Sequence, residues 1–152
     1  MKIDTKLRML AIDPGTKCGY ALNKPKQSGT WILKKSNRKE SEGIRYLRLT
    51  NHLHELSKID IVVYEEVRRH MGVDAAHIYG GIIATILQWC EENNIQYASV
   101  PVKVVKKLAT GNGNAKKDAM IQACKNRLNY DPIDDNEADA LWILEWAKIE
   151  FG

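Results

Sequence analysis

The sequence predicts an α/β domain in which a five-stranded mixed sheet is flanked by helices. Three runs rich in strand-forming residues come first, helical and strand-like segments then alternate, and the chain ends in helical segments. The chain has 152 residues, so we expect a single domain over positions 1–152 that buries about 70% of the surface of its unfolded chain.

The first three strands are expected in the stretches LRMLAID, GYALNK and GTWILKK, at positions 7–13, 19–24 and 29–35. Pro-Gly and Gly-Thr pairs, which favour turns, separate these runs, so the three strands should form an antiparallel meander. A fourth strand is expected at DIVVYEE and a fifth at IQYASVP. Because a helical pattern precedes the fourth strand, that strand should lie parallel in the sheet.

Helices are expected where apolar residues recur at intervals of three or four positions. These segments are 40–58, 73–94, 102–109, 115–128 and 134–151. The apolar stripe of segment 73–94 is too wide for one helix face, so this helix is either an interface between subunits or buried between the sheet and other helices. One architecture with this order of elements is the ribonuclease-H-like fold.

From the composition we expect a cytoplasmic protein, and the charge permits a nucleic-acid partner. No apolar run approaches the roughly 18 residues of a membrane span, and the first residues lack a secretory pattern. The three cysteines, at positions 18, 90 and 124, have no metal-binding spacing, so we expect reduced thiols. A net charge of +4 is only mildly basic, so the position of the charge matters more than its sum.

Two apolar strand-like runs end in carboxylates. Asp13 follows MLAI and precedes the turn Pro14-Gly15, and Glu65 and Glu66 follow IVVY on opposite faces of their strand. An acid here can be a turn residue or a solvated strand end. Because an unpaired buried carboxylate is costly, two acids at the same kind of position favour a functional role.

The last helical segment, DDNEADALWILEW, adds a third acidic position. Asp135 and Asp139 lie one turn apart on the same helix face, where like charges destabilise a helix unless a cation lies between them. Asp134 with Glu137 three residues later matches a capping box, so we expect Asp134 to cap the helix. Asp139 lies among apolar residues that should pack onto the sheet, which favours a functional role for this acid.

Asp13, Glu65 and Asp139 thus supply three separate acidic positions with no cysteine or histidine cluster. Hard cations that prefer oxygen ligands, such as Mg²⁺ or Mn²⁺, suit these donors better than zinc does. Two such ions about 3.5–4 Å apart activate a water and stabilise the leaving oxygen of a phosphodiester. The residues therefore predict metal-dependent phosphodiester hydrolysis.

Four stretches, in order along the chain, resemble motifs of the RuvC-type Holliday-junction resolvases. They are AIDPGTKCGYAL, VVYEEV, VKKLATGNGNAKKDAM and NEADALWI. The resemblance implies a structure-selective DNA endonuclease that resolves Holliday junctions by paired symmetric hydrolysis. It places metal-binding acids on Asp13, Glu65 and Asp139, and lysines that contact the DNA backbone on Lys106 and Lys117.

The chain departs from this family at two places. The family usually has two acids three residues apart in the last motif, whereas Asn136 stands three residues before Asp139. We favour Asp135 as the fourth ligand, and the amide oxygen of Asn136 is the alternative. The stretch Arg68-Arg69-His70 replaces an apolar or aromatic wedge, which suggests altered substrate discrimination, as in the shorter resolvases of bacterial viruses.

Basic residues lie beside the predicted acids and should contact DNA phosphates. Each cluster alone is often a solvated face, but an acid-lined cleft repels DNA unless basic residues flank it. We leave a third basic segment, 34–39, as solvent-facing. The expected contacts are Arg68, Arg69, Lys106, Lys107, Lys116 and Lys117.

A four-way junction needs two incisions related by two-fold symmetry, which an isologous homodimer provides. The helix around Gly80 and Gly81 is the expected interface. Two alternatives remain open at this point. The enzyme debranches three-way and flap DNA more broadly, or the protein binds junctions without cutting them.

Overall fold

Five strands form one sheet in the computed structural model of the chain, which describes residues 5–67 and 72–152. The strand order is β3-β2-β1-β4-β5. β2 pairs antiparallel with both β1 and β3, whereas β4 is parallel to both β1 and β5. Their bounds are β1 (Met9–Asp13), β2 (Lys17–Asn23), β3 (Lys26–Ile32), β4 (Ile61–Glu66) and β5 (Gln96–Pro101).

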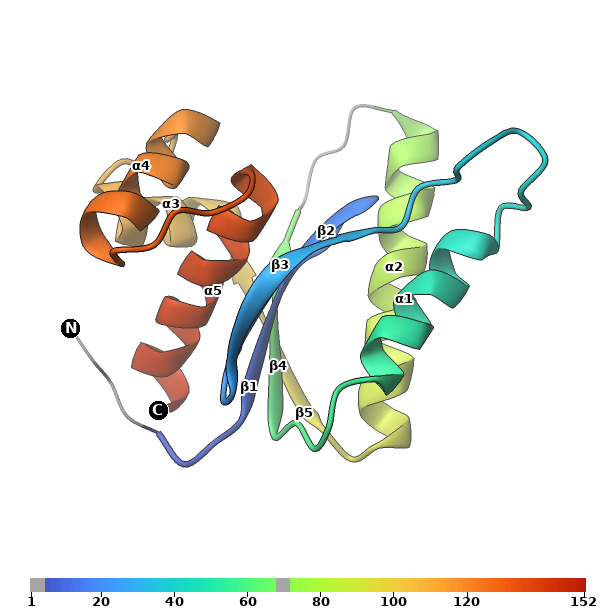
Figure 1. Ribbon diagram of the computed structural model, residues 1–152, viewed down its shortest axis with the longest axis horizontal. Helices are drawn as coiled ribbons and strands as arrows, with labels where there is room; N and C mark the ends of the chain where they lie inside the picture. The colour runs from blue at the N-terminus through green and yellow to red at the C-terminus, as the bar shows by residue number, and fades with distance from the viewer. Residues whose placement is uncertain (1–4, 68–71) are drawn as a thin grey trace.

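Helices cover the two faces of the sheet in separate layers (Figure 1). One layer holds α1 and α2, and the other holds α5 against the sheet with α3 and α4 beside it. The predicted mixed sheet flanked by helices is therefore confirmed. The helices are α1 (Ile44–His54), α2 (Val73–Glu92), α3 (Val102–Thr110), α4 (Lys117–Arg127) and α5 (Asp135–Phe151).

Each face of the sheet has its own hydrophobic core, because successive side chains of a strand point to opposite faces. In β1, Met9 and Ala11 belong to the core shared with α3, α4 and α5. Their neighbours Leu10 and Ile12 belong to the core shared with α1 and α2. The alternation decides which layer each residue at the end of the strand faces.

The third strand begins earlier than the sequence suggested. Lys26 pairs with Asn23, so the hairpin turn lies at Lys24-Pro25 and not at Gly29-Thr30. Gly29 lies inside β3, where it contacts the ring of Tyr20 on the neighbouring strand. The prediction was wrong here because the Gly-Thr pair serves side-chain packing and not a turn.

The wide apolar stripe of α2 is used in two ways. Ile82, Ile86 and Trp89 are buried against the sheet. Gly81 lets the ring of Tyr46 on α1 approach, since a Cβ at Gly81 would lie 2.5 Å from that ring. A Cβ at Gly80 would meet nothing within 4 Å, so this side of the helix is open.

The three cysteines are free and buried. Burial raises the pKa of Cys90 and of Cys124 to about 12, so both thiols stay protonated at neutral pH. Within the described part of the chain, no helix has the length and apolar character needed to cross a membrane.

Candidate metal centre

Two acids lie at the carboxyl ends of the central parallel strands. Ile12 of β1 pairs in register with Tyr64 of β4, so Asp13 and Glu65 follow at the same level of the sheet. Side-chain alternation places both acids on the face that α5 covers, and places Glu66 on the opposite face. The parallel pairing of two apolar strands thus brings together acids that are far apart in the sequence.

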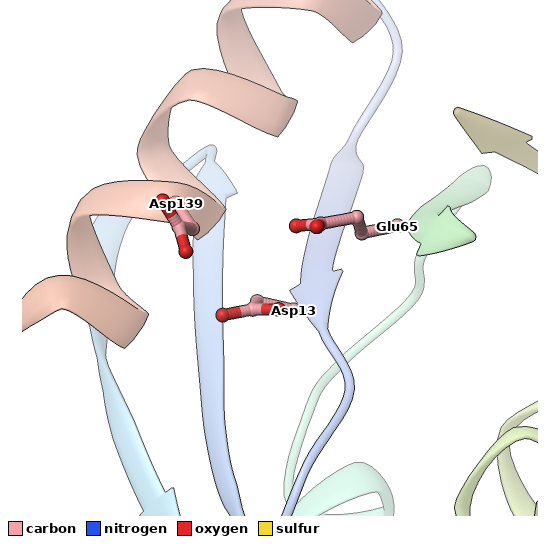
Figure 2. Close-up of side chains that lie close together, drawn as sticks. All are labelled: Asp13, Glu65 and Asp139. Carbon is pink, nitrogen blue, oxygen red and sulfur yellow. The ribbon is translucent and has the colours of Figure 1, made fainter. Parts of the chain in front are cut away.

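The third acid comes from the helix that crosses this face. Asp139 lies on α5, and carboxylate oxygens of Asp13, Glu65 and Asp139 all lie within 4.8 Å of one another. Figure 2 shows the three side chains converging from two strands and one helix. Glu65 is buried, and the other two acids are partly buried. These are the three acids expected from the sequence.

A glycine sets the distance between α5 and the sheet. Gly19 of β2 pairs with Asp13 of β1. A Cβ at Gly19 would lie 1.9 Å from the carbonyl oxygen of Asn136 on the first turn of α5, closer than any side chain permits. The helix therefore rests directly on the backbone of β2, next to the first acid. A glycine inside a strand is a known sign of such close approach, but the sequence did not say which element approaches.

Hydrogen bonds to β3 fix the start of α5. Asp134 caps the helix by accepting from the backbone N–H of Glu137 at 2.9 Å, as predicted, and it also accepts from the Thr30 hydroxyl at 2.7 Å. The buried Glu137 carboxylate accepts from the hydroxyls of Ser28 and Tyr130 at 2.7 and 2.9 Å. Sequence reasoning missed the two residues on β3, since nothing local marks them.

The crowding of the acids changes their protonation. Burial, and then the charges of Glu65, Asp139 and Asp135, raise the pKa of Asp13 well above its usual range. Burial likewise raises the pKa of Glu65, although the Lys106 ammonium opposes the shift. Burial and the neighbouring carboxylates raise the pKa of Asp139 to about 8. Without a cation, the three carboxylates cannot all be ionised at neutral pH at low cost.

A tyrosine holds the end of β4 in place. The Tyr79 hydroxyl on α2 donates to the carbonyl oxygen of Glu65 at 2.7 Å and accepts from the backbone N–H of Val67 at 3.1 Å. One hydroxyl thereby fixes the peptide groups on both sides of Glu66. Burial raises the pKa of Tyr79 to about 12, so the hydroxyl keeps the proton that it donates. No local pattern marks Tyr79, because its role depends on how α2 crosses β4.

Two lysines and a fourth acid adjoin the three carboxylates. The charge of Lys106 lowers the pKa of Glu65 and of Asp139, and the charge of Lys117 lowers that of Asp139. Asp135 lies outside the group of three acids and faces Lys117, with 3.9 Å between the ammonium nitrogen and a carboxylate oxygen. Its role as fourth ligand stays a prediction, as does the alternative of Asn136.

The other predicted DNA contacts have different surroundings. Lys116 is exposed and joins Lys106 and Lys117 around a hollow of about 500 Å³ at the start of α4. Lys107 is exposed and does not line this hollow. Arg68 and Arg69 lie outside the described residues.

The donor set fits a hard divalent cation. Three carboxylates converge, and no thiol or imidazole is among them. Mg²⁺ and Mn²⁺ prefer oxygen ligands of this kind. Burial also leaves the carboxylates in need of a positive charge, which a bound cation supplies.

Fold and site together define the class of protein. A mixed sheet ordered β3-β2-β1-β4-β5, with acids at the ends of its central parallel strands and on its last described helix, is the arrangement of a ribonuclease-H-like nuclease. No protein-family profile matches the chain. A crossover junction endodeoxyribonuclease RuvC from Brachyspira hyodysenteriae is 30% identical over 146 residues, which cover 88% of this chain and 89% of that protein. The chain belongs to the RuvC family of crossover junction endodeoxyribonucleases.

Further relatives agree with this assignment. The RuvC of a Synechococcus strain is 27% identical over 90% of this chain and 95% of its own length. A Thermus thermophilus RuvC solved with a Holliday junction substrate has a TM-score of 0.73 and 21% identity, covering 94% of this chain and 96% of that chain. A yeast mitochondrial Holliday junction resolvase has a TM-score of 0.65 and 16% identity, covering 97% of this chain and 82% of that chain. The predicted ribonuclease-H-like fold, the RuvC-type family and the class of endodeoxyribonuclease are confirmed.

Proposed function

We propose that residues 1–152 act as a single nuclease domain that resolves Holliday junctions by metal-dependent, paired symmetric hydrolysis of phosphodiesters. The observation that carries this proposal is the convergence of Asp13, Glu65 and Asp139 within 4.8 Å, in a chain of the RuvC family. The T. thermophilus relative was solved with a Holliday junction substrate, which supports four-way DNA as the substrate.

The three carboxylates would hold the metal, which we propose to be two Mg²⁺ ions, with Asp135 as a further ligand. When bound, such ions activate a water and stabilise the leaving oxygen of the phosphodiester. Lys106 and Lys117 neutralise part of the acidic charge, as their effect on the pKa of Asp139 indicates. Together with Lys107, Lys116, Arg68 and Arg69, they would contact DNA phosphates on approach to the acids.

We propose that the enzyme is a homodimer formed through the open side of α2. Gly80 lies on that side, and a Cβ there would have no neighbour within 4 Å. Ile83 and Leu87 of the same helix are only partly buried within the chain. A two-fold dimer would present two metal centres to the two strands that a junction resolvase must cut. Light scattering at working concentration tests this part, and a monomer would contradict it.

The proposed activity is tested on a synthetic immobile four-way junction beside linear duplex, flap and three-way DNA, in Mg²⁺ and in Mn²⁺. We expect paired symmetric nicks in the four-way junction, and we expect them to disappear in Asp13→Asn. Equal cutting of all branched substrates would indicate a broader debranching enzyme. Binding of junctions without cutting in either metal would contradict a nuclease.

A further inference from the structure

Positive charge is concentrated in one segment that the metal centre does not use. Residues 34–48, KKSNRKESEGIRYLR, contain six basic and two acidic residues and thus carry a net charge of +4. The whole chain also carries a net charge of +4. This segment, which links β3 to α1 and includes the start of that helix, therefore holds as much net positive charge as the entire protein.

Both acids of the segment are already paired inside it. Glu42 accepts from Lys35 at 2.6 Å and from Arg45 at 2.9 Å. Glu40 pairs with Arg48 at 2.5 Å. Arg48 also donates to the carbonyl oxygen of Lys34 at 2.9 Å, so it braces the segment against α1. The basic residues in these contacts, Lys35, Arg45 and Arg48, are all buried or partly buried.

Three basic side chains of the segment remain available. Lys34, Arg38 and Lys39 are exposed, and none of them forms an ion pair with any residue in the described ranges. Because the backbone around them is braced by Arg48 and Glu40, the entropy lost on fixing the segment against a ligand is reduced. A group of exposed cations on a braced segment suits a polyanion.

The topology places this segment at the catalytic end of the sheet. β3 ends beside the start of β2, where Ile32 pairs with Lys17. The backbone N–H groups of Leu33 and Lys34 donate to the carbonyl oxygen of Thr16, in the turn that follows β1 and its Asp13, at 2.7 and 3.2 Å. Figure 1 shows that the segment leaves the sheet on the side of α1 and α2, whereas α3 and α4 lie on the other side.

We propose that Lys34, Arg38 and Lys39 bind the sugar–phosphate backbone of a junction arm, on the flank of the metal centre opposite to Lys106 and Lys117. This inference rests on the proposed function and extends it. DNA that enters the acidic site crosses the end of the sheet and meets cations on both flanks. The sequence alone had left this segment facing solvent, because local composition does not show that β3 delivers it to the edge that carries Asp13.

The test compares two triple variants of equal charge. In the first, Lys34, Arg38 and Lys39 are replaced by alanine. In the control, alanine replaces Lys6, Lys26 and Lys58, which are exposed and adjoin the opposite ends of β1, β3 and β4. Binding of a labelled four-way junction is followed by fluorescence anisotropy in EDTA over a series of KCl concentrations.

We expect the first variant to bind the junction at least roughly tenfold more weakly and to lose about 0.9 of the log–log salt slope for each phosphate contact removed. The control should keep the wild-type slope. Equal slopes in the two variants would overturn the inference, and so would a change of oligomeric state that accounts for the loss of affinity. If the wild type neither binds nor cuts the junction, the proposed function fails together with this inference. If the wild type cuts the junction and the first variant binds it as tightly as the wild type does, the inference alone fails.

Discussion

The two faces of the sheet are built from the same strands, yet the three converging acids all lie on one of them. On the α1 and α2 side, Ile12 of β1 and Tyr64 of β4 join an apolar core. On the α5 side, the next residues are Asp13 and Glu65, which meet Asp139 at the edge of the other core. Neighbouring residues in one strand are therefore stabilised in opposite ways. The apolar residue is stabilised by burial, whereas the carboxylate is stabilised by a positive charge.

This difference shows how a group of acids can be added to a stable sheet without interrupting its core. The pleat sends alternate side chains to separate layers, so adjacent strand positions can serve an apolar core on one face and an acidic group on the other. The acids are concentrated at the carboxyl ends of parallel strands, where a cleft can form without interrupting the ladder. The comparison predicts opposite effects for substitutions at adjacent positions.

The largest expected effect comes from substituting these adjacent residues. Asp13→Asn should reduce junction cleavage at least about a thousandfold, because it removes a ligand from the metal site. The same change should raise the melting temperature in EDTA, since it removes one of three crowded buried acids. Ile12→Ala should instead lower the free energy of unfolding by about 2–5 kcal/mol and leave the folded enzyme active. Cleavage assays and thermal melts of both variants check this, and a stability loss in Asp13→Asn would contradict the comparison.

The next largest effect is expected from a substitution that disrupts the contact between Gly19 and Asn136. Gly19→Ala places a Cβ 1.9 Å from a helix carbonyl oxygen, so α5 must move away from β2 with its Asp139. We expect a loss of about 3 kcal/mol in the free energy of unfolding and a higher Mg²⁺ requirement for cleavage. Gly43→Ala, at a position with nothing within 4 Å of the added Cβ, is the control. Similar behaviour of the two variants in denaturant titrations would show that α5 does not rest on Gly19.

The pH dependence of stability sharpens the comparison, because burial raises the pKa of the three acids on the α5 face. Burial raises the pKa of Asp139 from 3.8 to about 8 and shifts those of Asp13 and Glu65 in the same direction. A carboxyl group with a raised folded-state pKa favours the fold at acidic pH, and this contribution is lost as the pH rises through that value. In EDTA, the melting temperature should therefore fall as the pH rises from about 5 to about 8.

Saturating Mg²⁺ should remove most of this fall, because the cation binds the ionised carboxylates of the folded state. The double variant Asp13→Asn with Asp139→Asn is the control and should show a flatter profile with little response to Mg²⁺. A wild-type profile that is flat in EDTA would count against crowded acids.

The smallest expected effect concerns Tyr79 of α2, whose hydroxyl bonds to the backbone at the end of β4. Tyr79→Phe removes the hydrogen bonds to Glu65 and Val67, each worth about 1 kcal/mol, so cleavage should fall roughly five- to tenfold. The Mg²⁺ concentration for half-maximal rate should rise. Tyr97→Phe, on the exposed edge strand β5, is the matched control. Unchanged kinetics in Tyr79→Phe would show that packing alone holds Glu65.

The three converging acids could be predicted from the sequence because each depends on a local pattern. Asp13 and Glu65 end apolar strands, and Asp139 interrupts an apolar helix face, so burial and charge conflict at each position. The parallel relation of β1 and β4 then follows from the helix between them. The position of Asp135 could not be predicted in the same way. It depends on the rotation of α5, which the distant residues Gly19 and Thr30 set.

The residues around the three acids could not be predicted from the sequence, because their roles arise from contacts between different helices and strands. Tyr79 looks like one more apolar residue of a helix, and its role exists only because α2 crosses the end of β4. The basic segment 34–39 looks like a solvated loop until the hairpin at Lys24-Pro25 fixes the length of β3 and hence where the segment emerges. Local patterns therefore identified the three converging acids, whereas register and helix crossing decided their neighbours.

The dependence of the site on α5 has a consequence during synthesis. Asp139 is translated after the whole sheet, and it reaches the other two acids only when α5 rests on Gly19 and is capped through Thr30. A ribosome-bound chain that has released only the residues up to Arg127 carries two of the three acids and lacks the helix that covers them. We therefore expect the acidic centre to be incomplete until the sheet has folded and α5 has docked.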